Sequence, residues 1–231
     1  VGGGGIAGAH FRRDTGAHRR IVRKLPIAGL VAARLLLPAA LHPPVIAAVA
    51  YMHATDELID TGDLSTRQEA LHRWDAQTSA ALESSSPPDD TTLLTLWDTT
   101  RRHPHMTARV RAFLDGAPLE ANWTGFDAEA DFQAYVDRYS LPALMLMASL
   151  MAPHPDAGVE DPFVRGCRAL IDGWQRCDFL ADLAEDAAKG RIGIPKDELA
   201  RHGLKFEDLQ TRSDACVPAL EDLVRAQTAL A

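Results

Sequence analysis

The sequence DELID at residues 56–60 and the sequence DLAED at residues 182–186 decide how this chain is interpreted. In each motif two aspartates stand four residues apart, so on a helix both carboxylates lie on one face, about 5–6 Å apart at Cβ. Both motifs interrupt stretches that are otherwise apolar and rich in helix-forming residues. Carboxylates in such surroundings are costly unless a cation lies between them. Two such helices facing each other would supply the hard oxygen ligands that Mg²⁺ prefers.

The second motif is longer than its five residues. At spacings of three, four and four residues, one helical stripe is formed by Gln175, Asp178, Asp182 and Asp186. A row of like charges repels itself, so this stripe is disfavoured without cations. A single pair of aspartates at this spacing is common by chance and usually lies on the solvent-exposed surface without binding a metal. Two pairs in apolar sequence, one of them extended, favour a site for metal and diphosphate.

The composition predicts one large all-α protein and excludes some partners. The chain has 231 residues, of which 46% are hydrophobic and 6% aromatic, and β-branched alternation is scarce. A formal net charge of −8 argues against nucleic-acid binding. The three cysteines show no paired spacing, which fits a reducing, cytoplasmic setting. The most apolar window, residues 25–52, is interrupted by charge and proline, so no transmembrane segment is expected.

We expect residues 1–24 to form a basic, flexible arm and residues 25–231 to form the helical domain. Glycine and proline positions predict helices over 45–61, 64–82, 91–102 and 107–114. Further helices are expected over 127–151, with a kink at Pro142, and over 161–189, 196–202 and 206–230. The apolar stretch 141–151 is interpreted either as ordinary core or as the wall of a substrate cavity.

The motifs and their flanks resemble the squalene/phytoene synthase-like enzymes from about residue 25 to residue 225. The resemblance is carried by RLLLP at 34–38, AYMHATDELID at 50–60, QRCDFLADLAED at 175–186 and GRIGIP at 190–195. It implies a single-domain, all-α isoprenoid synthase bundle with a central cavity. It also implies Mg²⁺ bound by Asp56, Asp60, Asp182 and Asp186, with Gln175 near the diphosphate. By comparison with this family, a last helix beyond Ala231 is expected to be missing.

The chain also departs from the family pattern. Where the family usually has arginine, asparagine, arginine and tyrosine, this sequence has His53, Asp178, Ala181 and Gly193. Leu141 and Leu144 stand in a stretch that normally carries glycines. Loss of the two arginines removes permanent positive charge that can grip phosphate, and the leucines narrow the cavity. Both changes favour a single diphosphate donor.

The leading hypothesis is therefore a Mg²⁺-dependent prenyltransferase that ionises an allylic prenyl diphosphate and transfers the prenyl group to an aromatic acceptor. The sequence looks similar to a squalene-synthase-like subgroup that prenylates carbazole-type natural products. The alternative is head-to-head coupling of two prenyl diphosphates, and a third possibility is a non-catalytic family member. A homodimer is compatible with this resemblance.

Each role has named candidates. Asp178 is a candidate extra metal ligand, and diphosphate contacts are expected from Gln175, Arg34 and Arg138. The residues expected to position or deprotonate the acceptor are Tyr135, Tyr139 and His53, with ordinary core packing as the alternative for each. The cavity wall is expected to include Leu141, Leu144 and Met145.

Overall fold

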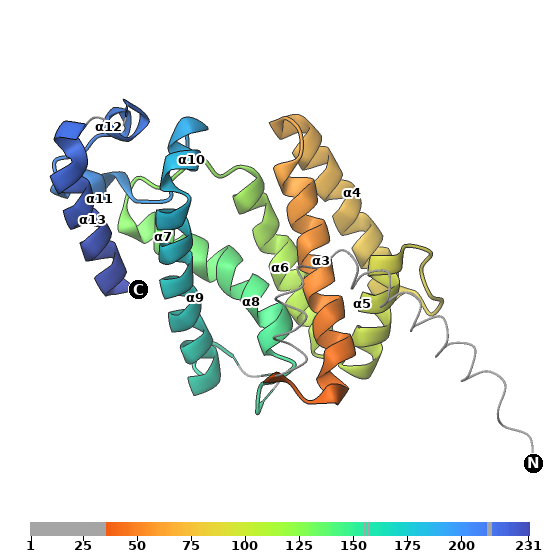
Figure 1. Ribbon diagram of the computed structural model, residues 1–231. Coiled ribbons are helices and arrows are strands. Elements are labelled where there is room, and N and C mark those ends of the chain that lie inside the picture. The colour runs from red at the N-terminus through yellow and green to blue at the C-terminus, as the bar shows by residue number, and fades with distance from the viewer. Residues whose placement is uncertain (1–35, 155, 157, 212–213) are drawn as a thin grey trace, which may run out of the picture. The chain divides into compact units, whose positions relative to one another are not determined.

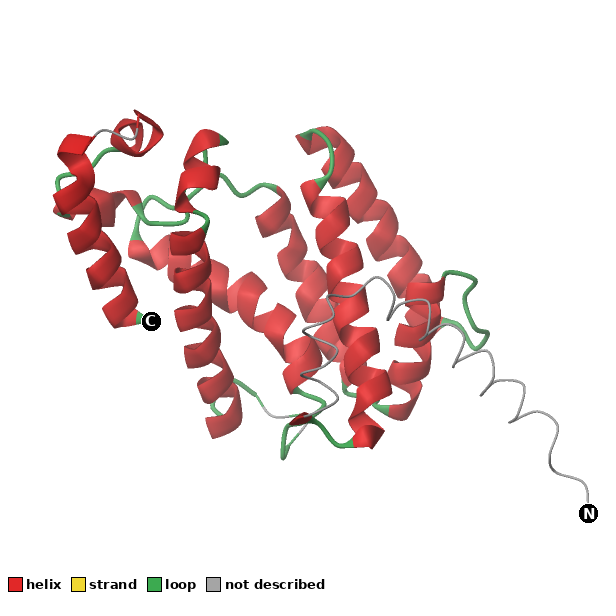
Figure 2. Ribbon diagram, in the orientation of Figure 1, coloured by secondary structure: helices red, strands yellow, loops and turns green. Residues whose placement is uncertain are grey.

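The computed structural model describes residues 36–154, 156, 158–211 and 214–231, and these residues form helices and turns without a β-strand (Figure 1, Figure 2). The expected all-α fold is confirmed. The basic arm at residues 1–24 and Arg34 lie outside the described residues. No helix in the described part of the chain has both the length and the hydropathy needed to cross a bilayer.

The chain divides into two compact units, each of which is described by itself. The N-terminal unit extends to Ala121 and also takes in Met145–Asp156, and the C-terminal unit comprises Asn122–Leu144 and Ala157–Ala231. The chain crosses between them three times, after Ala121, within α8 (Leu141–Ala148) and after Asp156. The expected domain boundary at residue 25 stays a prediction.

The N-terminal unit is a group of packed helices. Its elements are η1 (Ala39–Leu41), α3 (His42–Asp60), α4 (Leu64–Glu83), α5 (Thr91–Arg102) and α6 (Met106–Ala121). Helix α3 packs against α4, α5 and α6 (Figure 1). Asp63 begins α4 by accepting a hydrogen bond from the Thr66 amide at 2.8 Å, as an N-cap residue does. Helix α6 continues seven residues beyond the predicted end at 114, because Gly116, Ala117 and Ala121 are buried.

Tyr51 of α3 organises the core of this unit. Its ring is fully buried and stacks on Trp74 of α4, with 5.6 Å between ring centroids. The Tyr51 hydroxyl lies 3.1 Å from Thr78 Oγ1, and Trp74 Nε1 donates to Thr55 Oγ1 at 2.9 Å. Burial raises the pKa of Tyr51, so the hydroxyl stays protonated. These contacts fix the buried face of α3 and thereby the direction of the aspartates beside it.

The C-terminal unit consists of shorter helices around α9. Its elements are α7 (Glu129–Tyr135), η2 (Val136–Ser140), α9 (Pro162–Ala181), α10 (Leu183–Ala188), α11 (Lys196–Arg201), α12 (Phe206–Thr211), η3 (Asp214–Cys216) and α13 (Val217–Leu230). Helix α9 packs against η2 and α13. An aromatic cluster around Phe126 and Phe179 lies on one side of α9, and an aliphatic cluster around Ile194 and Leu223 is built from α10 onward.

Phe179 fixes the position of the segment that follows α10. Its ring stacks on Trp123, with 5.1 Å between centroids and 15° between planes. A Cβ atom placed on Gly193 would lie only 2.1 Å from Phe179 Cγ. Because the Phe179 ring occupies the space where a side chain at residue 193 would lie, only glycine fits at this position.

The predicted helix over 127–151 is divided into three parts. Helix α7 leads into η2, a π-helical turn in which the Leu141 amide donates to the Val136 carbonyl, five residues back. Pro142 follows directly, and in a regular α-helix its ring would clash with the carbonyl four residues earlier. The α-helix is thus interrupted by a π-turn on the N-terminal side of the proline, a form that often marks functional sites.

Candidate active site

The first aspartate pair lies on the last turns of α3, as predicted. Tyr51, Thr55 and Ile59 form the buried stripe of this helix, and Asp56 lies beside it, half-buried. Asp60 is exposed at the end of the helix. This pair is therefore more accessible than its apolar sequence suggested.

His53 belongs to the same face of α3 as the first pair, since it precedes Asp56 by three residues and Asp60 by seven. Its side chain is exposed. The position is therefore accessible to a substrate, and its assignment to the acceptor stays a prediction.

The second pair does not lie on one continuous helix, which corrects the prediction of a helix over 161–189. Helix α9 ends at Ala181, Asp182 takes a non-helical conformation, and α10 begins at Leu183. Hydrogen bonds nevertheless continue across this break. The Asp182 amide donates to the Asp178 carbonyl and the Asp186 amide to the Asp182 carbonyl, each at 2.9 Å. The three aspartates therefore follow one another at helical spacing through a local kink.

The three carboxylates of the second motif influence one another. The pKa of Asp178 is raised, chiefly because its carboxyl group loses surrounding water. The charges of Asp182 and Asp186 raise it further. The pKa of Asp186 is also raised, chiefly by burial, although the charge of Arg191 opposes this. Asp182 itself is exposed. Such a group repels its own charge and would be relieved by a bound cation.

Arg191 is a charged neighbour of this motif that the sequence analysis missed. Its Nη2 atom lies 3.6 Å from Asp186 Oδ1, and its guanidinium lies 5.4 Å from the centre of the Trp123 ring. The signal for this contact was the glycine after α10. Gly190 has a φ of +78°, and the Arg191 amide donates back to the Asp186 carbonyl at 2.9 Å. This Schellman motif returns the chain over the last turn of the helix.

The donor atoms of both pairs suit Mg²⁺, but they do not form a complete protein site. Within the described ranges, no group of three or more histidine, cysteine, aspartate or glutamate side chains is arranged to hold a metal ion. Magnesium is usually bound by one or two carboxylates together with water and substrate phosphates, and seldom by an all-protein cage. Exposed Asp60 and Asp182 and the mutually repelling Asp178 and Asp186 fit that mode. The two pairs belong to different units.

Gln175, the predicted diphosphate contact, is held by a serine from another helix. It lies on α9 one turn before Asp178 and is half-buried. Ser140, the last residue of η2, donates its hydroxyl to Gln175 Oε1 at 3.0 Å. Ser140 is 3% exposed. Sequence analysis missed this contact, since 35 residues separate the two side chains.

A buried arginine anchors α9 just beside Gln175. Arg176 bonds Asp172 at 2.8 Å and Gln227 of α13 at 3.0 Å, and it forms an ion pair with Glu129 of α7. Its guanidinium also lies 4.3 Å from the centre of the Phe132 ring. One side chain thereby joins three helices of the C-terminal unit.

A second arginine strengthens the contact between α9 and η2. Arg168 pairs with Asp137 at 2.9 Å and with Asp172 at 2.7 Å. Gln133 of α7 also donates to Asp172, at 3.0 Å. The part of α9 that precedes the second motif is therefore held firmly against α7 and η2.

The residues predicted for the acceptor and the cavity wall are mostly buried. Tyr135 is 5% exposed within the aromatic cluster, and the half-buried Tyr139 ring lies 5.5 Å from it, whereas Arg138 of η2 is exposed. Leu141 is buried and Leu144 half-buried in the C-terminal unit, and Met145 is buried in the N-terminal unit. Their assignment to a substrate cavity stays a prediction.

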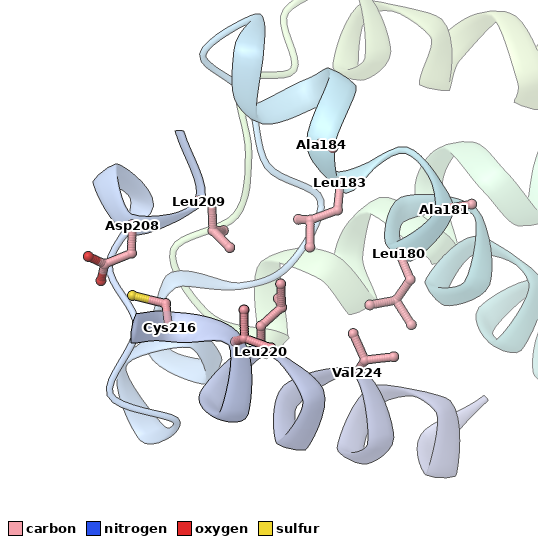
Figure 3. Close-up of a pocket in the computed structure, with 10 residues that line it drawn as sticks. Leu180, Ala181, Leu183, Ala184, Asp208, Leu209, Cys216, Leu220 and Val224 are labelled. Atoms are coloured by element: carbon pink, nitrogen blue, oxygen red, sulfur yellow. The ribbon is translucent and has the colours of Figure 1, made fainter. Parts of the chain in front are cut away.

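An apolar pocket of about 410 Å³ lies elsewhere in the C-terminal unit (Figure 3). It is lined by the end of α9, the start of α10, α12 and α13, and Leu183 and Leu220 point into it. The residues predicted for the cavity wall do not line this pocket.

Comparison with known proteins identifies the family. Residues 30–231 match the family model described as squalene/phytoene synthase. The chain belongs to the squalene/phytoene synthase family. It is 31% identical over 231 residues to the bifunctional protein CrtB/UppS of Streptomyces coelicolor, covering 98% of this chain and 39% of that protein. It is also 31% identical over 160 residues to the chloroplastic phytoene synthase 2 of Solanum lycopersicum, covering 67% of this chain and 50% of that protein.

Solved structures of other family members show the same fold. The squalene synthase HpnC from Alicyclobacillus acidocaldarius aligns with a TM-score of 0.73 at 20% identity, covering 96% of this chain and 83% of that one. A dehydrosqualene synthase solved with a ligand aligns with a TM-score of 0.75, also at 20% identity, covering 96% and 75%. The resemblance stated from the motifs is confirmed, while the chain spans half or less of the length of the two curated relatives described above.

Proposed function

We propose that this chain is a Mg²⁺-dependent isoprenoid synthase that couples two allylic prenyl diphosphates head to head. The observation that carries the proposal is the second motif in its family context. Asp178, Asp182 and Asp186 follow one another at helical spacing, Gln175 lies one turn before Asp178, and Arg191 lies 3.6 Å from Asp186. The names of its relatives, phytoene synthases among them, support coupling over the aromatic transfer that the sequence departures favoured.

The proposed reaction begins with heterolysis of a C–O bond. The pyrophosphate of the first substrate leaves with the electron pair, the double bond of the second substrate captures the allylic cation, and the resulting carbocation loses a proton. Loss of the second pyrophosphate and of a second proton then gives the coupled hydrocarbon. Mg²⁺, when bound, would neutralise the charge that develops on the leaving group. Asp56 and Asp60 in one unit and Asp182 and Asp186 in the other are the proposed ligands. Gln175 and Arg191 would donate hydrogen bonds to diphosphate oxygens.

Transfer to an aromatic, carbazole-type acceptor is the second candidate. It is favoured by the positions at which the family usually carries arginine, because His53 and Ala181 are both exposed and offer no guanidinium to a second diphosphate. In that case the acceptor ring carbon captures the cation, and a base such as Tyr139 takes the ring proton.

One set of incubations separates the two candidates. The full chain with Mg²⁺ is supplied with dimethylallyl, geranyl, farnesyl or geranylgeranyl diphosphate, with and without a hydroxylated carbazole. A C30 or C40 hydrocarbon formed without acceptor is the expected result. Product that forms only when the carbazole is present would replace coupling with aromatic transfer. Absence of pyrophosphate release in every incubation would point to the non-catalytic alternative.

The metal assignment makes a separate prediction. Asp182→Asn keeps the size of the side chain and removes its charge, so we expect turnover to fall by about 100-fold or more, as is typical when a group that stabilises transition-state charge is lost. Far-ultraviolet circular dichroism should stay unchanged, because Asp182 is exposed at a break between helices. Turnover at the wild-type rate would contradict the assignment.

A further inference from the structure

We infer that Ser140 is a positioning residue that fixes the side-chain amide of Gln175 so that its N–H groups point toward the diphosphate. The inference rests on the proposed function, in which Gln175 contacts that group. It concerns a residue of the π-turn that the sequence analysis did not select, and it assigns to the turn a role beyond accommodating Pro142.

The hydrogen bond defines which end of the amide faces which way. Ser140 Oγ donates to Gln175 Oε1 at 3.0 Å, and an amide oxygen engaged in this way leaves the nitrogen on the opposite side. Within the described part of the chain, no hydrogen-bond acceptor is recorded for Gln175 Nε2. Its two N–H donors are therefore available to a ligand on the face of α9 that also carries Asp178.

The surroundings hold both partners in place. Ser140 is 3% exposed, so water does not compete for its hydroxyl. Arg176 immediately follows Gln175 and is tied to Asp172 and Gln227, while Arg168 ties α9 to Asp137 of η2. The helix that carries Gln175 and the turn that carries Ser140 are thus connected at several points, so the side-chain bond does not have to order either backbone.

The π-turn explains why a serine can reach Gln175. The five-residue hydrogen bond from the Leu141 amide to the Val136 carbonyl widens this turn by one residue relative to an α-helix. Residues on either side of such a bulge are rotated relative to each other. Ser140 occupies the last position of the turn, where this rotation determines its direction toward α9.

Binding of inorganic pyrophosphate in the presence of Mg²⁺, measured by calorimetry on the full chain, tests the inference. For Ser140→Ala we expect affinity about five-fold weaker, the size typical of one lost neutral hydrogen bond. Gln175→Ala should weaken binding more, and adding Ser140→Ala to Gln175→Ala should weaken it no further. Gln175→Glu keeps the acceptor for Ser140 but replaces the amide donors, so it should bind as poorly as Gln175→Ala.

Ser149→Ala is the matched control. Ser149 is 1% exposed and its hydroxyl lies 3.4 Å from Met106 Sδ, so the substitution removes a buried hydroxyl in the N-terminal unit without touching Gln175. We expect wild-type pyrophosphate affinity for this variant. If Ser140→Ala fails to fold, Ser140→Cys keeps nearly the same volume with a weaker donor and should weaken pyrophosphate binding in the same direction.

The outcomes distinguish this inference from the proposed function. It is overturned if Ser140→Ala, or Ser140→Cys in its place, binds pyrophosphate as the wild type does. It is also overturned if the serine substitution causes an equal loss whether or not Gln175 is present. If Gln175→Ala binds normally while Asp182→Asn does not, the positioning role fails and the metal site stands. If wild-type protein binds no pyrophosphate with Mg²⁺, both the role and the proposed function fail.

Discussion

At the scale of single residues, the negative charge of Asp178 suits the proposed metal binding but lowers the stability of the metal-free protein. Its pKa is raised above the ordinary value of 3.8 by loss of water and by two neighbouring aspartates. A carboxyl group whose pKa is higher in the folded than in the unfolded chain favours folding when protonated. Its contribution is present at low pH and is lost as pH rises through the folded-state pKa. Without metal, the charged residue therefore destabilises the protein at neutral pH.

Asp178→Asn should consequently raise the midpoint of thermal unfolding at pH 7 in chelator, by about 1–2 °C, a small value because the side chain is exposed and screened. The gain should vanish near pH 3, where Asp178 is protonated. Asp63→Ala is the control, and it should lower the unfolding midpoint at pH 7. Asp63 caps α4, and the hydrogen bonds that it accepts from Thr66 and Ser65 lower the pKa of its carboxyl group. A lower midpoint for Asp178→Asn at pH 7 would show that the repulsion is not present in solution.

At the scale of elements, Arg176 holds α7, α9 and α13 together. Its replacement by methionine keeps much of the volume but leaves Glu129 without its cation and Asp172 with Arg168 as its remaining cation. Removing one partner of a buried ion pair typically costs about 3–5 kcal/mol. Because Glu129 is 38% exposed, we expect about 2–3 kcal/mol from urea denaturation of Arg176→Met.

Arg225→Met serves as the comparison for Arg176→Met. Arg225 pairs with Asp222 at 2.6 Å on α13, but both side chains are more than half exposed. Such surface pairs contribute about 0–1 kcal/mol, so its denaturation curve should nearly overlay that of the wild type. Equal losses of unfolding free energy for the two variants would mean that the contacts of Arg176 with three helices stabilise the protein no more than a surface ion pair does.

At the scale of the whole molecule, ligand binding should be visible as stability. A ligand at 100 times its dissociation constant adds about 2.7 kcal/mol to the free energy of unfolding. We therefore expect Mg²⁺ and pyrophosphate together to raise the unfolding midpoint by several degrees in differential scanning fluorimetry. Each alone should do less, because the carboxylates need the diphosphate oxygens to complete the coordination. The same increase in Asp182→Asn would place the binding elsewhere.

Local sequence signals predicted the helices well and their interruptions poorly. Asp63, Asp90 and Asp161 cap helices within one residue of the predicted starts, and Gly62 and Gly190 lie just beyond helix ends. These features act over a few residues, so a sequence displays them directly. The π-turn was only partly foreseen, because proline predicts a bend but not which hydrogen bonds change.

The candidate site shows the same difference between local features, which the sequence displays, and contacts between distant residues, which it does not. Both aspartate pairs were found from their spacing, whereas the partners of Gln175 and Arg176 were not. Those partners lie 35, 47 and 51 residues away in the chain, and no local pattern links a glutamine to one serine among many. Arg191 was within reach, since the glycine before it predicts a turn back over the helix. The break at Asp182 had no signal that we can identify.

The contact between Phe179 and Gly193 makes the sizes of these two side chains interdependent. The ring of Phe179 occupies the space in which a side chain at 193 would lie. Unless the backbone shifts, the two positions can therefore hold only one bulky side chain between them. A residue larger than glycine at 193 requires a smaller residue at 179, so the two positions can be exchanged only as a pair.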